Sequence, residues 1–206
     1  MAIRFHRDDV KIKEKAPLYQ GFLSVYRYSL QHRLFSGEWS PVIERELMER
    51  GNAVVVIPYD PVRDEFVVVE QFRVGALNDK NGPWLFEFVA GMFDANESAE
   101  EVAVREMEEE AGLKAKRLIY ATSYYSSPGG TDEKLTIYIA EVDSQSAAAY
   151  GGVPEEDEDI RVHAIPREHV MTMLEREEIN NAASVIGLQW LLLHRDKVFP
   201  IQQEQN

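Results

Sequence analysis

The chain has 206 residues, enough for one large domain or for one domain with a small appendage. Its net charge of −14 disfavours nonspecific binding to nucleic acid or to anionic lipid. It contains no cysteine, which excludes disulfides, thiolate nucleophiles and cysteine metal sites. The sequence shows neither a secretory signal nor an apolar run long enough to cross a bilayer, so a cytoplasmic location is expected.

Strands with turns are predicted between residues 18 and 50. The segments "FLSVYRYSL" and "HRLFSGEWSPVIERELM" carry aromatic and β-branched residues, and Ser36 and Gly37 form a turn signal. The segment "MERGNA" has the composition of a joint between domains. We therefore expect residues 1–50 to form a separate small β-sheet region and residues 51–206 to form the main domain.

A β-hairpin is predicted next, in "NAVVVIPYDPVRDEFVVVEQFRV". Two valine-rich runs flank "YDPVRDE", which has the Asp-Pro chemistry of a turn. The segment "PWLFEFVAGMF" is predicted to be one further strand that ends at Gly91.

Residues 98–111 give the clearest helix signal in the chain. Ser98 and Glu101 have the spacing of a capping box, and Gly112 stands where a glycine would end the helix. The apolar stripe at helical spacing consists of Ala99, Val102, Ala103 and Met107.

The rest of the chain is predicted as a strand, a loop and two helices. The segment "KLTIYIAEVD" is the strand, and residues 144–159 have the composition of a mobile acidic loop. The helices are expected in "PREHVMTMLEREEI" and "NAASVIGLQWLLLHRDKV". Together these elements predict an α/β protein whose mixed sheet is layered with helices.

The predicted helix carries an unusual density of acidic residues. Glu106, Glu109 and Glu110 share one face, because residues three and four apart are neighbours on a helix. Such a face is either simply solvated or holds a cation, and carboxylate oxygens suit Mg²⁺ or Mn²⁺. Arg105 is placed to brace one of these carboxylates through a bidentate contact.

The segment "GMFDANESAEEVAVREMEEEAGL", residues 91–113, decides between these interpretations. Its spacing of glycine, glutamate and arginine reproduces the Nudix box in full, so the chain resembles the Nudix hydrolase superfamily. The resemblance implies an α/β/α sandwich around a mixed sheet. It also implies hydrolysis of a nucleoside diphosphate linked to another group, with the help of several Mg²⁺ ions.

The resemblance also implies roles for individual residues of this box segment. The implied metal ligands are Glu106 and Glu110, with Glu109 close by, and the backbone carbonyl of Ala90. The residues expected to hold the motif in shape are Gly91, Glu97 and Gly112. Arg105 is expected to have a structural role first and a catalytic role second.

Several segments outside the box are similar to bacterial ADP-ribose pyrophosphatases. They include "FEFVAGMF", "PEEDEDIRVH" and "NNAASVIGLQWL". Pro128, sixteen residues after Gly112, fits the same branch, although a simple Pro-Gly turn would also explain it. This branch implies hydrolysis of ADP-ribose to AMP and ribose 5-phosphate with about two to three Mg²⁺ ions, for which Mn²⁺ could substitute. It also implies a homodimer that exchanges its N-terminal strands.

By the same resemblance, residues outside the box contact the substrate or move a proton. Arg45 and Arg73 are candidates for binding ADP-ribose, and Glu133 for contacting its ribose. Glu156 is the preferred general base, while Glu158 would complete a metal site and is the second candidate for the base. The competing interpretations are surface ion pairs for the arginines and a solvated loop for the acids.

Two other functions stay open on the sequence alone. One is a Nudix pyrophosphatase that acts on another substrate, such as GDP-mannose, a further sugar nucleotide or a reduced dinucleotide. The other is a noncatalytic module that binds a nucleotide, although all the box glutamates are present. A general role in nucleic-acid binding is disfavoured, because the chain is acidic and has no stripe of basic and aromatic residues.

Overall fold

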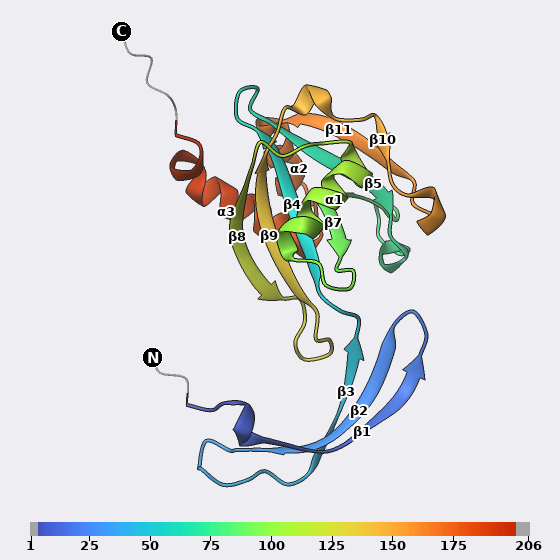
Figure 1. Cartoon of the computed structure of the whole chain (residues 1–206), viewed down its shortest axis with the longest axis vertical. Helices are drawn as coiled ribbons and strands as arrows, with labels where there is room; N and C mark the ends of the chain where they lie inside the picture. Colours follow the sequence, from blue (N-terminus) through green and yellow to red (C-terminus); the bar gives the residue numbers. More distant parts are fainter. Residues whose placement is uncertain (1–3, 201–206) are drawn as a thin grey trace. The chain divides into compact units, whose positions relative to one another are not determined.

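The computed structural model describes residues 4–200, apart from the side chain of Glu156 (Figure 1). These residues divide into two compact units. The small-sheet unit comprises the residues up to 52 together with 125–134, and the large-sheet unit comprises residues 53–124 together with those from 135 on. No helix in the described part of the chain is both long and apolar enough to span a membrane.

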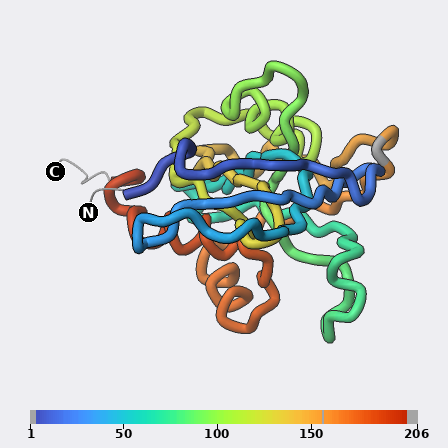
Figure 2. Tube along the Cα trace, turned by 90° about the horizontal axis from the view of Figure 1, so that it is seen from below, coloured from blue at the N-terminus to red at the C-terminus, as the bar shows by residue number. Residues whose placement is uncertain are grey.

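The small-sheet unit contains an antiparallel sheet in the order β1-β2-β3, whose strands run side by side (Figure 2). The strands are β1 (Val10–Gln20), β2 (Ser24–His32) and β3 (Ile43–Glu49), and η1 (Arg7–Asp9) precedes them. None of the strand residues is fully buried. The prediction that strands begin near residue 18 missed most of β1, because a strand that faces solvent on both sides shows no apolar alternation.

The large-sheet unit is built on a mixed sheet in the order β10-β11-β5-β4-β9-β8. Its central strands are β4 (Ala53–Asp60), β5 (Glu65–Phe72) and β9 (Lys134–Glu141), and β4 runs parallel to β9. The outer strands are β8 (Arg117–Tyr125), β10 (Tyr150–Gly151) and β11 (Ile160–Pro166). The predicted hairpin is confirmed as β4 and β5, which pair antiparallel beside their turn.

Beyond that turn β4 and β5 separate, and two short strands occupy the split. β6 (Trp84–Glu87) pairs with β5, and β7 (Val89–Met92) pairs with β4. The prediction of one continuous strand in "PWLFEFVAGMF" is therefore wrong, because the chain changes its pairing partner at Phe88. Phe88 is itself buried, with 1% of its surface exposed.

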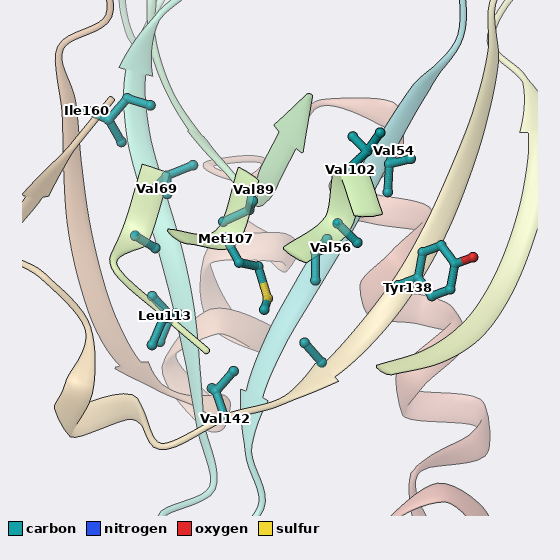
Figure 3. Packing of buried hydrophobic residues seen from close by; sticks show 14 residues of the cluster. Val54, Val56, Val69, Val89, Val102, Met107, Leu113, Tyr138, Val142 and Ile160 are labelled. Atoms are coloured by element: carbon teal, nitrogen blue, oxygen red, sulfur yellow. The ribbon is translucent and has the colours of Figure 1, made fainter. Parts of the chain in front are cut away.

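Two hydrophobic cores lie on opposite faces of this sheet. Val54 and Val56 of β4 belong to the core that includes Met107 of α1 (Ala99–Ala111), and Figure 3 shows Met107 among these valines. Val55 and Ile57 belong to the other core, which receives side chains from α2 (Arg167–Glu175) and α3 (Ala182–Val198). A strand that is covered on both faces reads as a continuous apolar run. The predicted mixed α/β fold with helices on both faces is confirmed.

The predicted boundaries of the box helix are also confirmed. The Ser98 side chain accepts a hydrogen bond from the Glu101 backbone N–H, and the Glu101 carboxylate accepts one from the Ser98 backbone N–H. Gly112 ends α1 with a φ of 64°, a left-handed conformation that glycine adopts without steric cost.

A row of aromatic rings connects the strand split to the end of α3. Phe88 packs edge-on against Phe66 with ring centroids 5.9 Å apart. The ring centroids of Phe66 and Tyr59 are 5.0 Å apart, and those of Tyr59 and Phe199 are 5.2 Å apart. These rings fill the face of the sheet that α2 and α3 cover.

The buried carboxylate of Asp60 fixes the turn after β4 and the start of the segment 144–159. It accepts hydrogen bonds from the backbone N–H groups of Val62 and Ser144 and from the Arg63 side chain. Burial alone would raise its pKa, but these donors hold the pKa of Asp60 down to about 2. Segment 144–159, predicted as a mobile acidic loop, carries β10, η3 (Ser144–Ser146) and η4 (Pro154–Glu156).

We expect Asp60→Asn to lower the melting temperature at pH 7, because an amide cannot accept all of these bonds and carries no charge to balance Arg63. A carboxylate with a lowered pKa stabilises the fold above its unfolded pKa, and this contribution is lost as the pH falls towards the folded pKa of about 2. The difference in melting temperature should therefore be largest near neutral pH and shrink from pH 4 downward, and thermal unfolding measured across this range checks it. The exposed Asp8→Asn serves as the control, and a difference that does not depend on pH would contradict the assignment.

Candidate active site

The Arg105 guanidinium lies at the centre of the acidic residues of α1 and of the loop before it. Its Nε and Nη2 atoms each lie 3.0 Å from one carboxylate oxygen of Glu97. Its Nη1 atom lies 2.7 Å from Oε1 of Glu106 and 3.0 Å from Oε2 of Glu109. It also donates to the backbone carbonyl of Met92. One planar cation thus offsets the repulsion among three carboxylates and holds the loop against the helix.

Glu106 is packed against the backbone of Gly91. A Cβ atom at position 91 would overlap the Glu106 carboxylate, so only glycine leaves room for this side chain. Burial raises the pKa of Glu106, Arg105 lowers it, and the negative charges of Glu109 and Glu158 raise it further. The structure thus gives a steric reason for the glycine at the start of the box.

Glu110 is the most deeply buried carboxylate of the box helix, with 1% of its surface exposed. Its Oε2 atom accepts a hydrogen bond of 3.2 Å from the backbone N–H of Ala90 in β7. Burial raises the pKa of Glu110 well above its ordinary value, and the charge of Glu106 adds to the effect. A buried carboxylate with so little compensation is a group whose charge a bound cation would stabilise.

The acidic segment that starts at Gly152 is hydrogen-bonded to the same helix. The backbone N–H of Gly152 donates to the carbonyl of Glu109 at 2.9 Å, and Oε2 of Glu158 accepts from the backbone N–H of Val153. The charge of Glu158 raises the pKa of both Glu106 and Glu110, so it acts on the same region. The side chain of Glu156 lies outside the described part of the structure.

An arginine and a buried glutamate form a second ion pair near the box. Arg73 follows β5, and its Nε and Nη2 atoms both lie 2.9 Å from Oε2 of Glu87 at the end of β6. The charge of Arg73 opposes the rise in the pKa of Glu110. Arg73 was expected from the sequence, but Glu87 was missed, because its only signal is a carboxylate inside the apolar run "WLFEFVAGMF".

The remaining two predicted substrate residues belong to the small-sheet unit. Arg45 lies on β3 with an exposed side chain, and its Nη1 atom donates to the carbonyl of Glu44. Glu133 is buried, with 8% of its surface exposed, and pairs with Arg50 at 3.2 Å. Within this unit both side chains therefore have protein partners.

The chemistry of the box fits a divalent cation, although the side chains do not form a finished cage. Glu106, Glu109 and Glu110 offer hard oxygen donors on one helix face, which suit Mg²⁺ or Mn²⁺. In the described range of the chain, no three His, Asp or Glu side chains converge closely enough to hold an ion. Arg105 instead engages two of the three box carboxylates.

Comparison with known proteins places this chain in a family. The sequence model of the NUDIX domain matches residues 49–186. An ADP-ribose pyrophosphatase of Escherichia coli (strain K12) is 48% identical over 194 residues, which are 94% of this chain and 93% of that protein. An ADP-ribose pyrophosphatase of Haemophilus influenzae is 42% identical over 193 residues, 92% of this chain and 89% of that protein.

Two more distant similarities are to a protein named for another substrate and to a solved structure. A GDP-mannose pyrophosphatase of Enterobacter sp. (strain 638) is 37% identical over 150 residues, 72% of this chain and 77% of that protein. A crystal structure described as an ADP compounds hydrolase superposes with a TM-score of 0.71 at 23% identity, covering 94% of this chain and 97% of that one, and supports the fold alone.

The domain match spans more than half of the chain, and relatives above 40% identity cover almost all of it. The predicted resemblance is therefore confirmed. The chain belongs to the NUDIX hydrolase family, whose members generally use divalent metal ions.

Proposed function

We propose that this protein hydrolyses the diphosphate of ADP-ribose to give AMP and ribose 5-phosphate. The observation that carries this proposal is the 48% identity to an ADP-ribose pyrophosphatase over 94% of the chain. The geometry supports it, because the half-buried carboxylate of Glu106 and the buried carboxylate of Glu110 lie against β7 on one side of the box helix. A cytoplasmic location, where nucleoside diphosphates and Mg²⁺ are abundant, is part of the same proposal.

The metal in this proposal is Mg²⁺, with Mn²⁺ as a substitute and about two to three ions per site. The donors that would hold it are Glu106, Glu109, Glu110, Glu158 and the backbone carbonyl of Ala90. Bound there, the metal would neutralise charge on the diphosphate and lower the pKa of a water molecule. Arg105 would keep the carboxylates in place through its bonds to Glu97, which leave its contacts to Glu106 and Glu109 free to change.

The remaining steps are assigned to residues outside the box. Glu156 is proposed to take the proton from the attacking water, with Glu158 as the second candidate. Arg45, Arg73 and Glu133 are proposed to contact the substrate. If Glu156→Gln keeps normal turnover at saturating Mg²⁺, the role of the base passes to Glu158.

The box should show opposite effects on activity and on stability when Glu110 is changed to Gln. Turnover of ADP-ribose should fall by about 100-fold or more, because a negatively charged metal donor is lost. In EDTA the melting temperature at neutral pH should rise by about 2–4 °C, because a buried charge is removed while the acceptor for Ala90 stays.

The pH dependence gives this variant a further check. A carboxylate with a raised pKa contributes stability that is complete below its ordinary value of 4.5 and is lost as the pH rises through the folded pKa. In EDTA the unmodified protein should therefore lose stability with rising pH more steeply than Glu110→Gln. The exposed Glu100→Gln on the same helix should match the unmodified protein in turnover and melting, and a fall in both quantities for Glu110→Gln would contradict this account.

The small-sheet unit supports the proposal of a homodimer with exchanged N-terminal strands. None of its strand residues is fully buried, and Tyr19 and Phe22 expose 60% and 92% of their surface. A small sheet without a covered apolar face is rarely stable alone, so a second copy is the proposed cover.

Equilibrium sedimentation at micromolar concentration is expected to give twice the chain mass of 23.6 kDa. Phe22→Ser and Tyr19→Ser together should shift the equilibrium towards the monomer, since they remove apolar surface from the proposed contact. The exposed Leu193→Ser in α3, which loses a similar apolar side chain outside this sheet, is the matched control. A monomer in the unmodified protein would exclude the dimer.

A substrate panel tests the proposed reaction against its rivals. The rival substrate supported by a specific observation is GDP-mannose, because a pyrophosphatase of that name is 37% identical over 72% of the chain. With Mg²⁺, kcat/KM for ADP-ribose should exceed that for GDP-mannose by about 10-fold or more, since the loss of one hydrogen bond of about 1.4 kcal/mol corresponds to this factor. Chromatography should show AMP as a product, and EDTA should abolish its release. Equal values for the two substrates would overturn the assignment, and binding without turnover would indicate a noncatalytic module.

A further inference from the structure

Glu87 is a buried acidic residue to which the proposed reaction gives no role. It exposes 9% of its surface, and its Oε2 atom receives both the Nε and the Nη2 atoms of Arg73 at 2.9 Å. Gln71, also buried, donates to the same oxygen from 3.4 Å. Three donor atoms therefore converge on one carboxylate oxygen.

The sheet register determines which face this group occupies. Glu87 pairs with Val69, so both side chains lie on the same face of the sheet. Val69 packs in the core with Met107 of α1, which is the helix that carries the box carboxylates. Glu70 points to the opposite face, where it pairs with His163 at 2.9 Å. The Glu87 pair thus belongs to the layer of the box, and the Glu70 pair does not.

The two partners of the ion pair differ in their exposure to solvent. The Glu87 side chain is 11% exposed, whereas the Arg73 side chain is 43% exposed. Nη1 of Arg73 has no hydrogen-bond partner among the described residues, while its other two nitrogens are engaged by Glu87. A guanidinium held along one edge presents its remaining donors in a fixed direction.

Stability alone is a weak reason for this arrangement. A buried carboxylate loses its hydration, and apolar side chains of similar size usually serve a core at least as well. Glu87 holds the guanidinium from the sheet face against which α1 packs. The oriented guanidinium is therefore held from the side of the acidic box helix, where an anionic ligand would otherwise be repelled.

We infer that Glu87 is a positioning residue, which holds the Arg73 guanidinium so that its free donors bind the diphosphate of the substrate. This inference rests on the proposed function, because it takes a nucleoside diphosphate as the ligand. Glu87 acts through Arg73 and does not touch the substrate itself.

A double-mutant cycle tests this dependence. We expect Glu87→Gln to lower kcat/KM for ADP-ribose by about tenfold, chiefly through a higher KM, since a weakened contact of about 1.4 kcal/mol corresponds to that factor. Arg73→Lys keeps the charge but loses the two-nitrogen contact, so it should cost about as much. In the double variant, kcat/KM should be at most about twofold lower than in Arg73→Lys alone. The reason is that Glu87 has then already lost the group through which it acts.

Glu70→Gln is the matched control, because it changes a carboxylate contact of equal length, to His163, on the opposite face of the same sheet. It should leave kcat/KM unchanged, and melting curves of all variants show whether each one is folded. Losses that multiply in the double variant, or a Glu87→Gln variant with normal kinetics, would overturn the inference.

The same cycle is measured on the binding of ADP-ribose by calorimetry in EDTA. Coupling between Glu87 and Arg73 in the dissociation constant, without AMP release by the unmodified protein, would support the positioning role and reject the proposed reaction. AMP release with additive effects on binding and turnover would leave the reaction standing and reject the role of Glu87.

Discussion

The contact between Arg105 and its acidic neighbours is the interaction on which the box depends. Without a cation, the carboxylates of Glu97, Glu106 and Glu109 would repel one another across the joint between loop and helix. A guanidinium meets this need because its donors lie in one plane and reach several acceptors at once. Its two bonds to Glu97 form a stable base, while its contacts to the other two carboxylates are single bonds. Arg105 therefore holds Glu97 firmly, while Glu106 and Glu109 can more easily exchange their contacts with it.

Buried acids in this protein fall into two classes, and their surroundings explain the difference. Asp60 is surrounded by N–H donors, so its negative charge is stabilised and its pKa is lowered. Glu110 receives one backbone N–H and lies near other carboxylates, so its pKa is raised. The first arrangement contributes to folding, whereas the second costs stability at the carboxylate that we propose as a metal ligand.

The sequence predicted the elements whose signals are local. The capping residues Ser98 and Glu101, the end of the helix at Gly112 and the apolar runs of β4 and β5 all matched the structure. β1 was mostly missed because its exposure on both faces removes the alternation of apolar residues. The break at Phe88 arises because the chain pairs with β5 before this residue and with β4 after it. Both partners are distant in sequence, so no local pattern predicts the break.

The site divides in the same way. Box spacing predicted that Arg105, Glu106 and Glu110 lie close together, because one helix carries all three. Glu87 was not predicted, because its burial and its partner depend on the pairing of β6 with β5 and on Arg73, fourteen residues earlier in the chain. A short apolar segment with one acid can equally be a strand edge, so composition alone does not show that the acid is buried. Roles that require tertiary pairing become visible only in the folded chain.

The aromatic row that begins at Phe88 has a consequence for how this protein tolerates change. Phe88 follows Glu87 and precedes Ala90 by two residues, yet its ring packs on the far side of the sheet, with Phe66 and then Tyr59. A larger side chain beneath α3 would therefore displace β7, against which Glu106 and Glu110 lie. Substitutions in the core beneath α2 and α3 can therefore shift the acidic site indirectly. Evolution, or a library of random variants, can in this way change activity without changing any residue that contacts the ligand.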